Sequence, residues 1–555
     1  MRFMKTILFT FLAGTAMTFG TAASAQTVFV HEPTIPVVVG RPNNILFDLR
    51  VTPTRDGERM TSVTVDFPQQ DLPYIEAVRI FYTGTTSMLG SRTASSGLAH
   101  GMTEYGGGQR VFDHPAYAVL LAQDTKVAAK RKRSVTLNFD QRLFPWANYF
   151  YISLSVADNT PLTFKFTPRV TKVAFDGGRF AQLDHNHKAD GHRAAVSVRT
   201  AGDDGVHSYR IPGLATTPAG TLLGVYDVRN QNNIDLQEDV QVGLSRSTDG
   251  GRTWEPMRRI MDMTSYGSLP HSQNGVGDPS ILVDHLRGRV WVMALWNHGF
   301  GGGRGWWTSR NNAMTPEEQT GQVLLVHSDN DGRTWSQPEN ITAQIKDPSW
   351  HLILQGPGRG IVMQDSTLVF PIQWTDSTHM PFASVVWSRD NGRTWTIGAP
   401  AFRNTTEAQV VELEPGVLML NMRRNGGDSR AICVTRDMGR TWEEHPTSRK
   451  ALPEPVCMAS LIKVPAAGNV LGKDILLFSN PDTTKTRARI TIKASLDNGL
   501  TWLPENELLL DEEPGWGYSC LTMIDPETVG ILYESSVAQM AFQAVPLRDI
   551  VKKED

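Results

Sequence analysis

Apolar and polar residues alternate in short runs along most of the chain. Seven such runs, separated by Pro, Gly, Asn and Asp, lie between residue 26 and about residue 185. Alternation with a period of two predicts strands that bury one face, so this region is predicted to form a β-sandwich. The segment HNHKADGHR, residues 185–193, interrupts the pattern and predicts a linker. The runs are TVFVHE, NILFDLRV, TSVTVDF, VRIFYTG, SVTLNFD, YFYISLSV and LTFKFTPRVTKVAF.

From about residue 194 to 548, strand-like runs are followed by one repeated phrase. Its copies are STDGGRTW, SDNDGRTW, SRDNGRTW, TRDMGRTW and SLDNGLTW, which end at Trp254, Trp335, Trp395, Trp442 and Trp502. In a hairpin, Asp or Asn accepts hydrogen bonds from the turn backbone, and Gly takes a positive φ. The Trp supplies an apolar plate that packs against neighbouring strands. The repeats predict a β-propeller, here six-bladed, in an all-β chain, with the phrase as a structural fastener on the outer rim.

Length, charge and cysteine content limit the possible domain number, location and partners of the protein. A chain of 555 residues exceeds the size of most single cores, so two or more domains are expected. Residues 1–25 combine a basic start, an apolar run and a small-residue cleavage site, which predicts a secretory signal peptide and export to the periplasm or the medium. No membrane span and no nucleic-acid partner are expected, the latter because the net charge is only −3. Cys433, Cys457 and Cys520 lack the number and spacing of a disulfide framework or metal site.

The repeated phrase resembles the Asp-box of sialidases, S-x-D-x-G-x-T-W, which also occurs in other secreted propeller proteins. Two copies depart from it: Asn330 stands in place of Asp, and Thr435 in place of Ser. Both replacements keep a hydrogen-bonding side chain, so the structural interpretation is unchanged.

Further segments resemble bacterial and animal sialidases in family order. They are YRIP at 209–212, GVYDVRNQNNIDL, TEAQVVEL at 406–413, LNMR at 420–423, NPDTTKTR at 480–487 and GWGYSCL at 515–521. The resemblance covers about 350 residues. It implies a secreted, retaining exo-α-sialidase with residues 26–188 as an accessory, possibly carbohydrate-binding β-sandwich, and residues 189–555 as a six-bladed catalytic propeller. Its expected partners are sialylated glycans, and it requires neither cofactor nor metal.

The resemblance assigns the substrate's carboxylate to Arg210, Arg423 and Arg487. Arginine suits this task because its planar fork donates two parallel hydrogen bonds and stays protonated. Arg424 competes with Arg423, since adjacent residues of a strand point to opposite faces.

The catalytic groups that the resemblance implies are a tyrosine and two carboxylates. Tyr518 is the expected nucleophile, as in the sialidases that depart from the usual pair of carboxylates. Because a phenol has a pKa of about 10, it needs a base, and Glu407 is expected in that role with Glu412 as a weaker rival. Asp235 is the expected acid/base, with Glu238 and Asp239 as rivals in the same loop.

Residues that would set specificity carry weaker signals. Asp278 matches a position that contacts the N-acetyl amide, and Arg229 is expected beside the acid/base and in contact with the substrate. The glycine-rich segment GFGGGRGWW follows Trp296 and ends with Trp306 and Trp307. These tryptophans fit either sugar contact or ordinary packing.

Three other functions remain open at this point. A sialoglycan-binding propeller without catalysis is one, and it would be expected to lack the nucleophile, base or acid. A trans-sialidase, or an enzyme that releases an anhydro-sugar by internal attack, would share all of these residues. An Asp-box protein unrelated to sialic acid would explain the repeats, but the matches of YRIP, LNMR and GYSCL would then be coincidental. The bond linkage and the oligomeric state are not encoded in any of these motifs.

Overall fold

The computed structural model describes residues 26–87, 118–187, 189–236, 238–299, 314–318 and 321–552. The predicted signal peptide, Trp306 and Trp307 lie outside these residues. In the described ranges the structure is all-β, as predicted, and its α-helices are single turns: α2 (Val127–Lys130), α4 (Thr342–Ile345) and α5 (Leu547–Ile550). No helix within these ranges is long and apolar enough to span a membrane.

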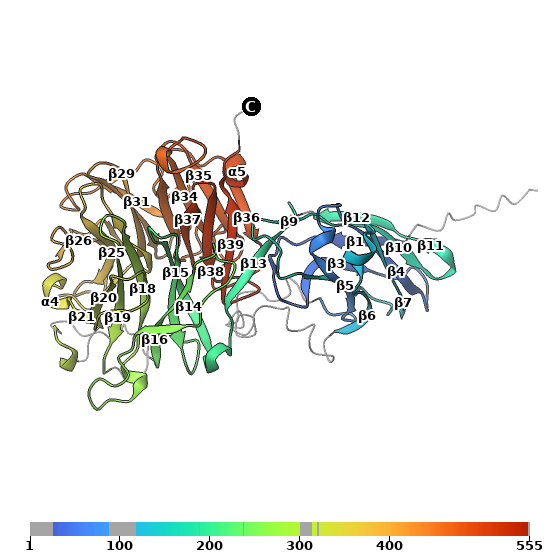
Figure 1. Cartoon of the computed structure of the whole chain (residues 1–555), viewed down its shortest axis with the longest axis horizontal. Coiled ribbons are helices and arrows are strands. Elements are labelled where there is room, and N and C mark those ends of the chain that lie inside the picture. The colour runs from blue at the N-terminus through green and yellow to red at the C-terminus, as the bar shows by residue number, and fades with distance from the viewer. Residues whose placement is uncertain are drawn as a thin grey trace, which may run out of the picture.

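The N-terminal region forms two sheets that share one hydrophobic core (Figure 1). One sheet has the order β12-β1-β3-β8-β5-β6 and the other the order β11-β10-β4-β7. The strands are β1 (Thr27–His31), β3 (Asn44–Val51), β4 (Arg59–Asp66), β5 (Ile75–Tyr82), β6 (Val119–Asp124), β7 (Ser134–Arg142), β8 (Asn148–Val156), β10 (Arg169–Phe175), β11 (Arg179–Phe180) and β12 (Gln182–His187).

The alternation read from the sequence appears directly in β7. Val135 and Leu137 are buried in the core, whereas Ser134, Thr136 and Asn138 are exposed. One face of the strand therefore packs against the opposite sheet, and the other faces solvent.

The remainder of the chain forms six sheets in succession. The first five have their strands in sequence order apart from short additions, and the sixth has the order β13-β39-β38-β37, so it joins the start of the region to its end. The strands of the first three sheets are β14 (Ser208–Thr216), β15 (Leu222–Arg229), β16 (Val240–Ser247), β17 (Arg258–Met261), β18 (Val276–Asp284), β19 (Arg289–Asn297), β20 (Gly321–Ser328), β21 (Glu339–Asn340), β22 (Ile353–Gln355), β23 (Gly358–Arg359), β24 (Ile361–Val362), β25 (Leu368–Thr375), β26 (Pro381–Ser388), β27 (Thr396–Ile397) and β28 (Phe402–Arg403). Those of the last three are β29 (Thr405–Glu414), β30 (Val417–Arg424), β31 (Ala431–Thr435), β32 (Glu443–Glu444), β33 (Ser460–Val464), β34 (Ile475–Pro481), β35 (Ile490–Ser495), β36 (Glu507–Asp511), β37 (Ser519–Asp525), β38 (Thr528–Tyr533), β39 (Met540–Pro546) and β13 (His192–Arg199).

The leading strands of neighbouring sheets lie against one another. β14 contacts both β18 and β37, and β29 contacts both β25 and β33. The first and sixth sheets are therefore neighbours, although they are far apart in sequence. Because they are covered by strands of the adjacent sheets, most residues of β14 and β18 are buried, polar ones included.

The two regions meet through backbone and charged contacts. The short strands β2 (Val37–Val38) and β9 (Lys165–Phe166) both pair with β13. The Glu512 amide also donates to the Thr34 carbonyl at 2.8 Å, and Nε2 of His31 lies 3.3 Å from Glu512 Oε1. The N-terminal region thus lies against the sixth sheet, as Figure 1 shows.

Each repeated phrase forms the turn between the third and fourth strands of a sheet. In the third copy, the Ser388 hydroxyl accepts from the Gly392 amide at 2.8 Å, and the Asp390 carboxylate accepts from the Thr394 amide at 2.9 Å and from its hydroxyl at 2.6 Å. The Trp395 indole donates to the Gly392 carbonyl at 3.2 Å. This hydrogen-bonded turn confirms the structural role predicted for the phrase.

The two divergent copies keep the same bonds. Asn330 accepts from the Thr334 amide at 2.9 Å and donates to its hydroxyl at 2.8 Å, so an amide replaces the carboxylate without loss of a contact. Thr435 accepts from the Gly439 amide at 2.9 Å, as serine does in the other copies.

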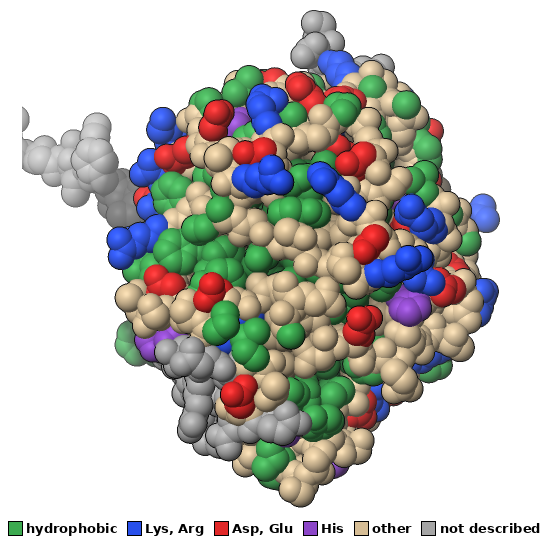
Figure 2. All heavy atoms as spheres, turned by 90° about the vertical axis from the view of Figure 1, so that its left-hand side faces the viewer, with side chains coloured by type: hydrophobic (Ala, Val, Ile, Leu, Met, Phe, Trp, Pro, Cys, Tyr) green, Lys and Arg blue, Asp and Glu red, His purple; other side chains and the backbone are tan. Residues whose placement is uncertain are grey.

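The surface opposite the N-terminal region carries mixed charges. Figure 2 shows lysine and arginine side chains interspersed with aspartate and glutamate on this face. This mixture agrees with a net charge near zero, and any strong positive field must be confined to a pocket.

Candidate active site

The predicted site residues gather where the leading strands of the six sheets begin. Arg210 lies near the start of β14, Asp278 near the start of β18 and Glu407 near the start of β29, while Tyr518 directly precedes β37. They surround a cavity of about 170 Å³ whose lining includes Asp235, Asp278, Glu407, Arg423 and Tyr518. Residues spread over more than 300 positions therefore meet at one end of the leading strands.

Tyr518 is the centre of this group. Its hydroxyl donates to the Glu407 carboxylate and accepts from Nη1 of Arg423 at 3.0 Å. Nη1 of Arg423 also lies 2.6 Å from Glu407 Oε2, so the three side chains form a closed hydrogen-bonded set. Burial and the Glu407 charge raise the pKa of Tyr518 well above its ordinary value, while Arg423 and Arg487 act in the opposite direction. The phenol is thus neutral at rest and already bonded to a proton acceptor.

Two more arginines flank the Tyr518 ring. The guanidinium carbons of Arg210 and Arg487 lie 5.3 Å and 5.4 Å from the ring centroid. Arg487 donates to the carbonyl oxygens of Trp516 at 3.1 Å and Val456 at 3.2 Å. Three positive side chains therefore surround one phenol, an arrangement that favours an anionic ligand.

The structure decides between Arg423 and Arg424. Arg423 reaches Glu407 and Tyr518, whereas Nε of Arg424 donates to the Ser429 carbonyl at 3.3 Å and its Nη2 lies 3.7 Å from Asp428. The two side chains diverge because consecutive residues of β30 point to opposite faces of the strand.

Glu534 is a site residue that the sequence alone did not reveal. Its fully buried carboxylate accepts from Arg210 Nε at 2.7 Å and from Arg210 Nη2 at 3.3 Å. It also accepts from the backbone amides of Ile211 and Tyr518, both at 3.0 Å. One carboxylate thus orients an arginine and the backbone of the tyrosine. No motif pointed to it, since its function depends on strands that meet only in the folded chain.

Asp235 lies on the loop after β15, at the mouth of the cavity. Its Oδ1 accepts from Arg229 Nη1 at 2.9 Å and lies 3.8 Å from Arg210 Nη1, while 63% of its side chain remains exposed. Loss of hydration raises the pKa of Asp235, but Arg229 and then Arg210 lower it by more, so the carboxyl is held well below its usual range. The group is reachable from solvent and ionised in the empty site.

The rival carboxylates of this loop are placed differently. Asp239 is buried and accepts from the side-chain amides of Gln241 at 2.7 Å and Asn230 at 3.2 Å. Neither Asp239 nor Glu238 is among the residues that line the cavity. Asp235 is therefore the loop carboxylate that faces the tyrosine.

Asp227 holds both Arg229 and Asp278 in place. Its buried carboxylate accepts from Arg229 Nη2 at 2.9 Å and from the Asp278 amide at 2.7 Å. Asp278 itself has a φ of +56°, an unusual backbone conformation for a residue with a side chain. Burial and the charges of Asp227 and Glu407 raise the pKa of Asp278 well above its usual value. The position of Asp227 two residues before Arg229 on one strand face is a signal that could have revealed it.

The rest of the cavity wall is largely apolar. Leu236, Leu295, Leu352 and Trp374 line it opposite the charged groups. Trp296 does not line it: this side chain is 1% exposed and packs edge-on against Tyr266, with ring centroids 4.7 Å apart. Of the two roles considered for Trp296, the structure supports packing.

Within the described ranges, no three His, Cys, Asp or Glu side chains are grouped so that they could hold a metal ion. Cys433, Cys457 and Cys520 are buried and form no disulfide.

Comparison with known proteins gives consistent matches to one family. The BNR repeat-like domain matches residues 229–531, and the N-terminal domain of BNR-repeat neuraminidase matches residues 25–179. A sialidase of Bacteroides fragilis (strain YCH46) is 52% identical over 534 residues, which cover 95% of this chain and 96% of the relative. A sialidase of Paraclostridium sordellii is 32% identical over 352 residues, which cover 59% of this chain and 81% of the relative.

A solved structure agrees with these relatives. A Hadza microbial sialidase superposes with a TM-score of 0.87 at 50% identity, covering 94% of this chain and all of the other. Fold and site together define a glycoside hydrolase. The chain belongs to the family of BNR-repeat sialidases, or neuraminidases, and its enzyme class is exo-α-sialidase.

Proposed function

We propose that this enzyme hydrolyses terminal α-linked sialic acid from glycoproteins, glycolipids and oligosaccharides, with retention and through a covalent tyrosyl intermediate. The observation that carries the proposal is the contact of the Tyr518 hydroxyl with both Glu407 and Arg423 inside a pocket rich in arginine. A neutral phenol with a bonded carboxylate is suited to attack a centre that already bears a carboxylate, because a carboxylate nucleophile would be repelled there.

Arg210, Arg423 and Arg487 bind the carboxylate of the sugar. Arg210 and Arg423 are held by Glu534 and Glu407, whereas Arg487 is held by two backbone carbonyls. Pre-oriented guanidinium groups lose little freedom when they bind, so the sugar's anomeric carbon is presented to Tyr518 in one orientation.

Glu407 accepts the Tyr518 proton as the phenolic oxygen attacks the anomeric carbon. The glycosidic bond breaks in the same step, and Asp235 donates a proton to the departing oxygen. Asp235 then takes a proton from the incoming water, which attacks the anomeric carbon. The bond from this carbon to the Tyr518 oxygen breaks, and Glu407 returns its proton to that oxygen. Two displacements at one carbon restore the original configuration.

The ionisation of Asp235 couples its chemistry to substrate binding. In the empty site Arg229 and Arg210 favour its carboxylate form. The bound substrate carboxylate offsets part of this positive field, so the pKa of Asp235 rises and the group acquires the proton that it must donate.

Asp278 and the apolar wall recognise the rest of the sugar. We assign the Asp278 carboxyl to the N-acetyl amide and the surface of Leu295, Leu352 and Trp374 to its methyl group, since these side chains line the cavity beside Tyr518. Arg229 acts through its contact with Asp235.

The six sheets are assigned as the blades of a β-propeller that comprises residues 189–555. The contacts of β14 with both β18 and β37, and the pairing of β13 with β39, support this ring. Residues 26–188 form a β-sandwich accessory domain whose glycan-binding role is part of the proposal. A signal peptide at residues 1–25 would export the protein to the periplasm or the medium.

NMR of the wild-type reaction tests the proposal. A sialoside with a fluorescent phenol as leaving group is incubated with the enzyme, and the first-formed sugar is identified. Free sialic acid that appears first as the α anomer supports retaining hydrolysis. An anhydro-sugar or a sialylated acceptor would place the enzyme among transferases, and a first-formed β anomer would exclude the tyrosyl intermediate.

A further inference from the structure

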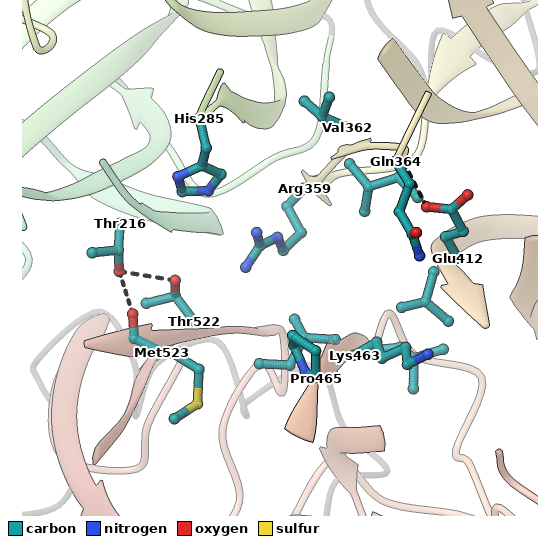
Figure 3. A pocket seen from close by; sticks show the side chains of 14 residues that line it. Thr216, His285, Arg359, Val362, Gln364, Glu412, Lys463, Pro465, Thr522 and Met523 are labelled. Atoms are coloured by element: carbon teal, nitrogen blue, oxygen red, sulfur yellow. Dashed lines mark hydrogen bonds between the residues drawn. The ribbon is translucent and has the colours of Figure 1, made fainter. Parts of the chain in front are cut away.

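A second cavity lies at the other end of the same leading strands (Figure 3). Arg210 is near the start of β14 and Thr216 ends it, and Glu407 and Glu412 stand in the same relation on β29. Thr216, Arg359, Glu412, Lys463 and Thr522 line this cavity, which has a volume of about 350 Å³. It is therefore separate from the active site and uses none of the active-site side chains.

Arg359 extends into the middle of this cavity, as Figure 3 shows. Its Nη1 donates to the Leu521 carbonyl at 3.0 Å, whereas its Nε is buried without a hydrogen-bond partner in the described structure. Among the described residues, Arg359 forms no ion pair within 4.0 Å. Burial lowers the pKa of Arg359, which contrasts with the raised values of the paired Arg210 and Arg423. The Arg359 side chain is partly exposed to the cavity and has no counter-charge there, so its guanidinium is available to an anionic ligand.

The other charged groups of the cavity do not compensate Arg359. The Glu412 oxygens accept from the backbone amides of Gln364 and Gly416, at 2.8 Å and 2.9 Å. Lys463 forms an ion pair with Asp474 at 3.3 Å. Burial, and then the Arg359 charge, lower the pKa of His285, so this ring is neutral at pH 7. Of the two cationic side chains that line the cavity, Lys463 has an ion pair and Arg359 has none among the described residues.

We propose that this cavity binds a small oxyanion, such as phosphate or sulfate, through the Arg359 guanidinium. The planar fork presents paired N–H groups that suit two oxygen atoms better than a spherical chloride. Gln364 also lines the cavity, and its side-chain amide can supply a further donor. An anion here would link the β23, β33 and β37 ends and stabilise the ring of sheets without contact with the active site.

Thermal unfolding in different anions tests this site. Wild type and Arg359→Met are melted in increasing phosphate, sulfate, acetate and chloride at equal ionic strength, beside Arg393→Gln as a control at an exposed arginine of a repeated turn. A ligand that binds only the folded state raises Tm with its concentration. We expect phosphate or sulfate to raise the Tm of wild type and Arg393→Gln by about 2 °C or more relative to chloride. Arg359→Met should show no such rise.

The two variants also separate anion binding from a structural role of Arg359. In chloride, Arg359→Met should unfold within about 2 °C of wild type, because it removes a partly exposed, unpaired charge together with one hydrogen bond. Isothermal titration of folded wild type with phosphate should give one site per chain, absent in Arg359→Met. An equal Tm rise in both proteins, or no heat of binding to wild type, would overturn the proposal. A rise with acetate alone would assign the site to carboxylates and also overturn it.

Discussion

The Tyr518 hydroxyl donates a hydrogen bond to the Glu407 carboxylate, which belongs to a different sheet and lies 111 residues earlier in the chain. Arg423 contacts both groups, so the residues that we propose as nucleophile, base and substrate ligand form one connected unit. This unit makes the proposed chemistry testable with single substitutions.

Replacing Tyr518 with phenylalanine should lower kcat by at least about 1000-fold, because the covalent step loses its nucleophile. Tyr533→Phe is the matched control: Tyr533 is also buried, and its hydroxyl contacts Gln543 at 3.1 Å, away from the cavity. It should lose some stability but retain kcat. Initial rates with a sialoside and Tm values for both variants check this. Near-normal turnover by folded Tyr518→Phe would contradict the tyrosine mechanism.

Glu407→Gln should lower kcat by about 100-fold, since an amide cannot accept the phenolic proton. Glu412→Gln changes the same type of residue on the same strand but at the opposite end, and should leave kcat unchanged. Steady-state kinetics of the two variants distinguish a base from a general effect of charge on β29. Equal losses in both would argue against a specific role for Glu407.

The pH dependence should differ between free and bound enzyme. Burial raises the pKa of Asp235, but Arg229 and Arg210 lower it by more, so the free enzyme holds this carboxyl ionised at neutral pH. Substrate binding offsets that field and raises the pKa. We therefore expect the alkaline limb of kcat/KM, which reports the free enzyme, to lie at lower pH than that of kcat. Profiles for a sialoside with a poor leaving group measure both limbs, and coincident limbs would refute the coupling.

Asp235→Asn should impair natural glycosides more than activated ones. A poor leaving group needs the proton that Asp235 supplies, so its cleavage should slow by about 100-fold. A leaving group that departs as a stable phenolate should be less affected in the bond-breaking step. The effect of the substitution on each substrate is measured from two pre-steady-state rates: release of phenol from an aryl sialoside and cleavage of an alkyl sialoside. Asp239→Asn, which alters a buried loop carboxylate outside the cavity, should not reproduce this dependence on the leaving group.

The repeated turns should affect stability and leave catalysis intact. Asp390→Ala removes the acceptor for the Thr394 amide and hydroxyl, so Tm should fall by about 2 to 4 °C without a change in kcat. The Thr394 hydrogen bonds lower the pKa of Asp390 to about 2. Its stabilisation is therefore present above the unfolded pKa of about 3.9 and is lost as the pH falls toward 2. The difference in Tm between the two proteins should shrink below pH 4, and a loss of activity at constant Tm would contradict a structural role.

Local patterns predicted much of this molecule correctly because they depend on neighbours in sequence. Alternating residues such as those of β7 specify a strand with one buried face. The phrase around Asp390 contains its own donors and acceptors within eight residues, so its turn forms without help from distant parts of the chain. The chemical identity of Tyr518, Glu407 and the arginines likewise followed from short motifs.

The choice among neighbouring candidates depended on tertiary structure. Glu407 and Glu412 are the same type of residue, but about 17 Å of extended strand separates them, and only the Glu407 end meets Tyr518. Arg423 and Arg424 are chemically alike, and the pleat of β30 turns one toward the cavity and the other away. The sequence by itself determined the strands, the turns and the kinds of group available for chemistry. Only the packing of six sheets decided which groups meet, because proximity across hundreds of residues is a property of the folded chain. This packing placed Glu534 against Arg210. It also left Nε of Arg359 without a hydrogen-bond partner in the described structure.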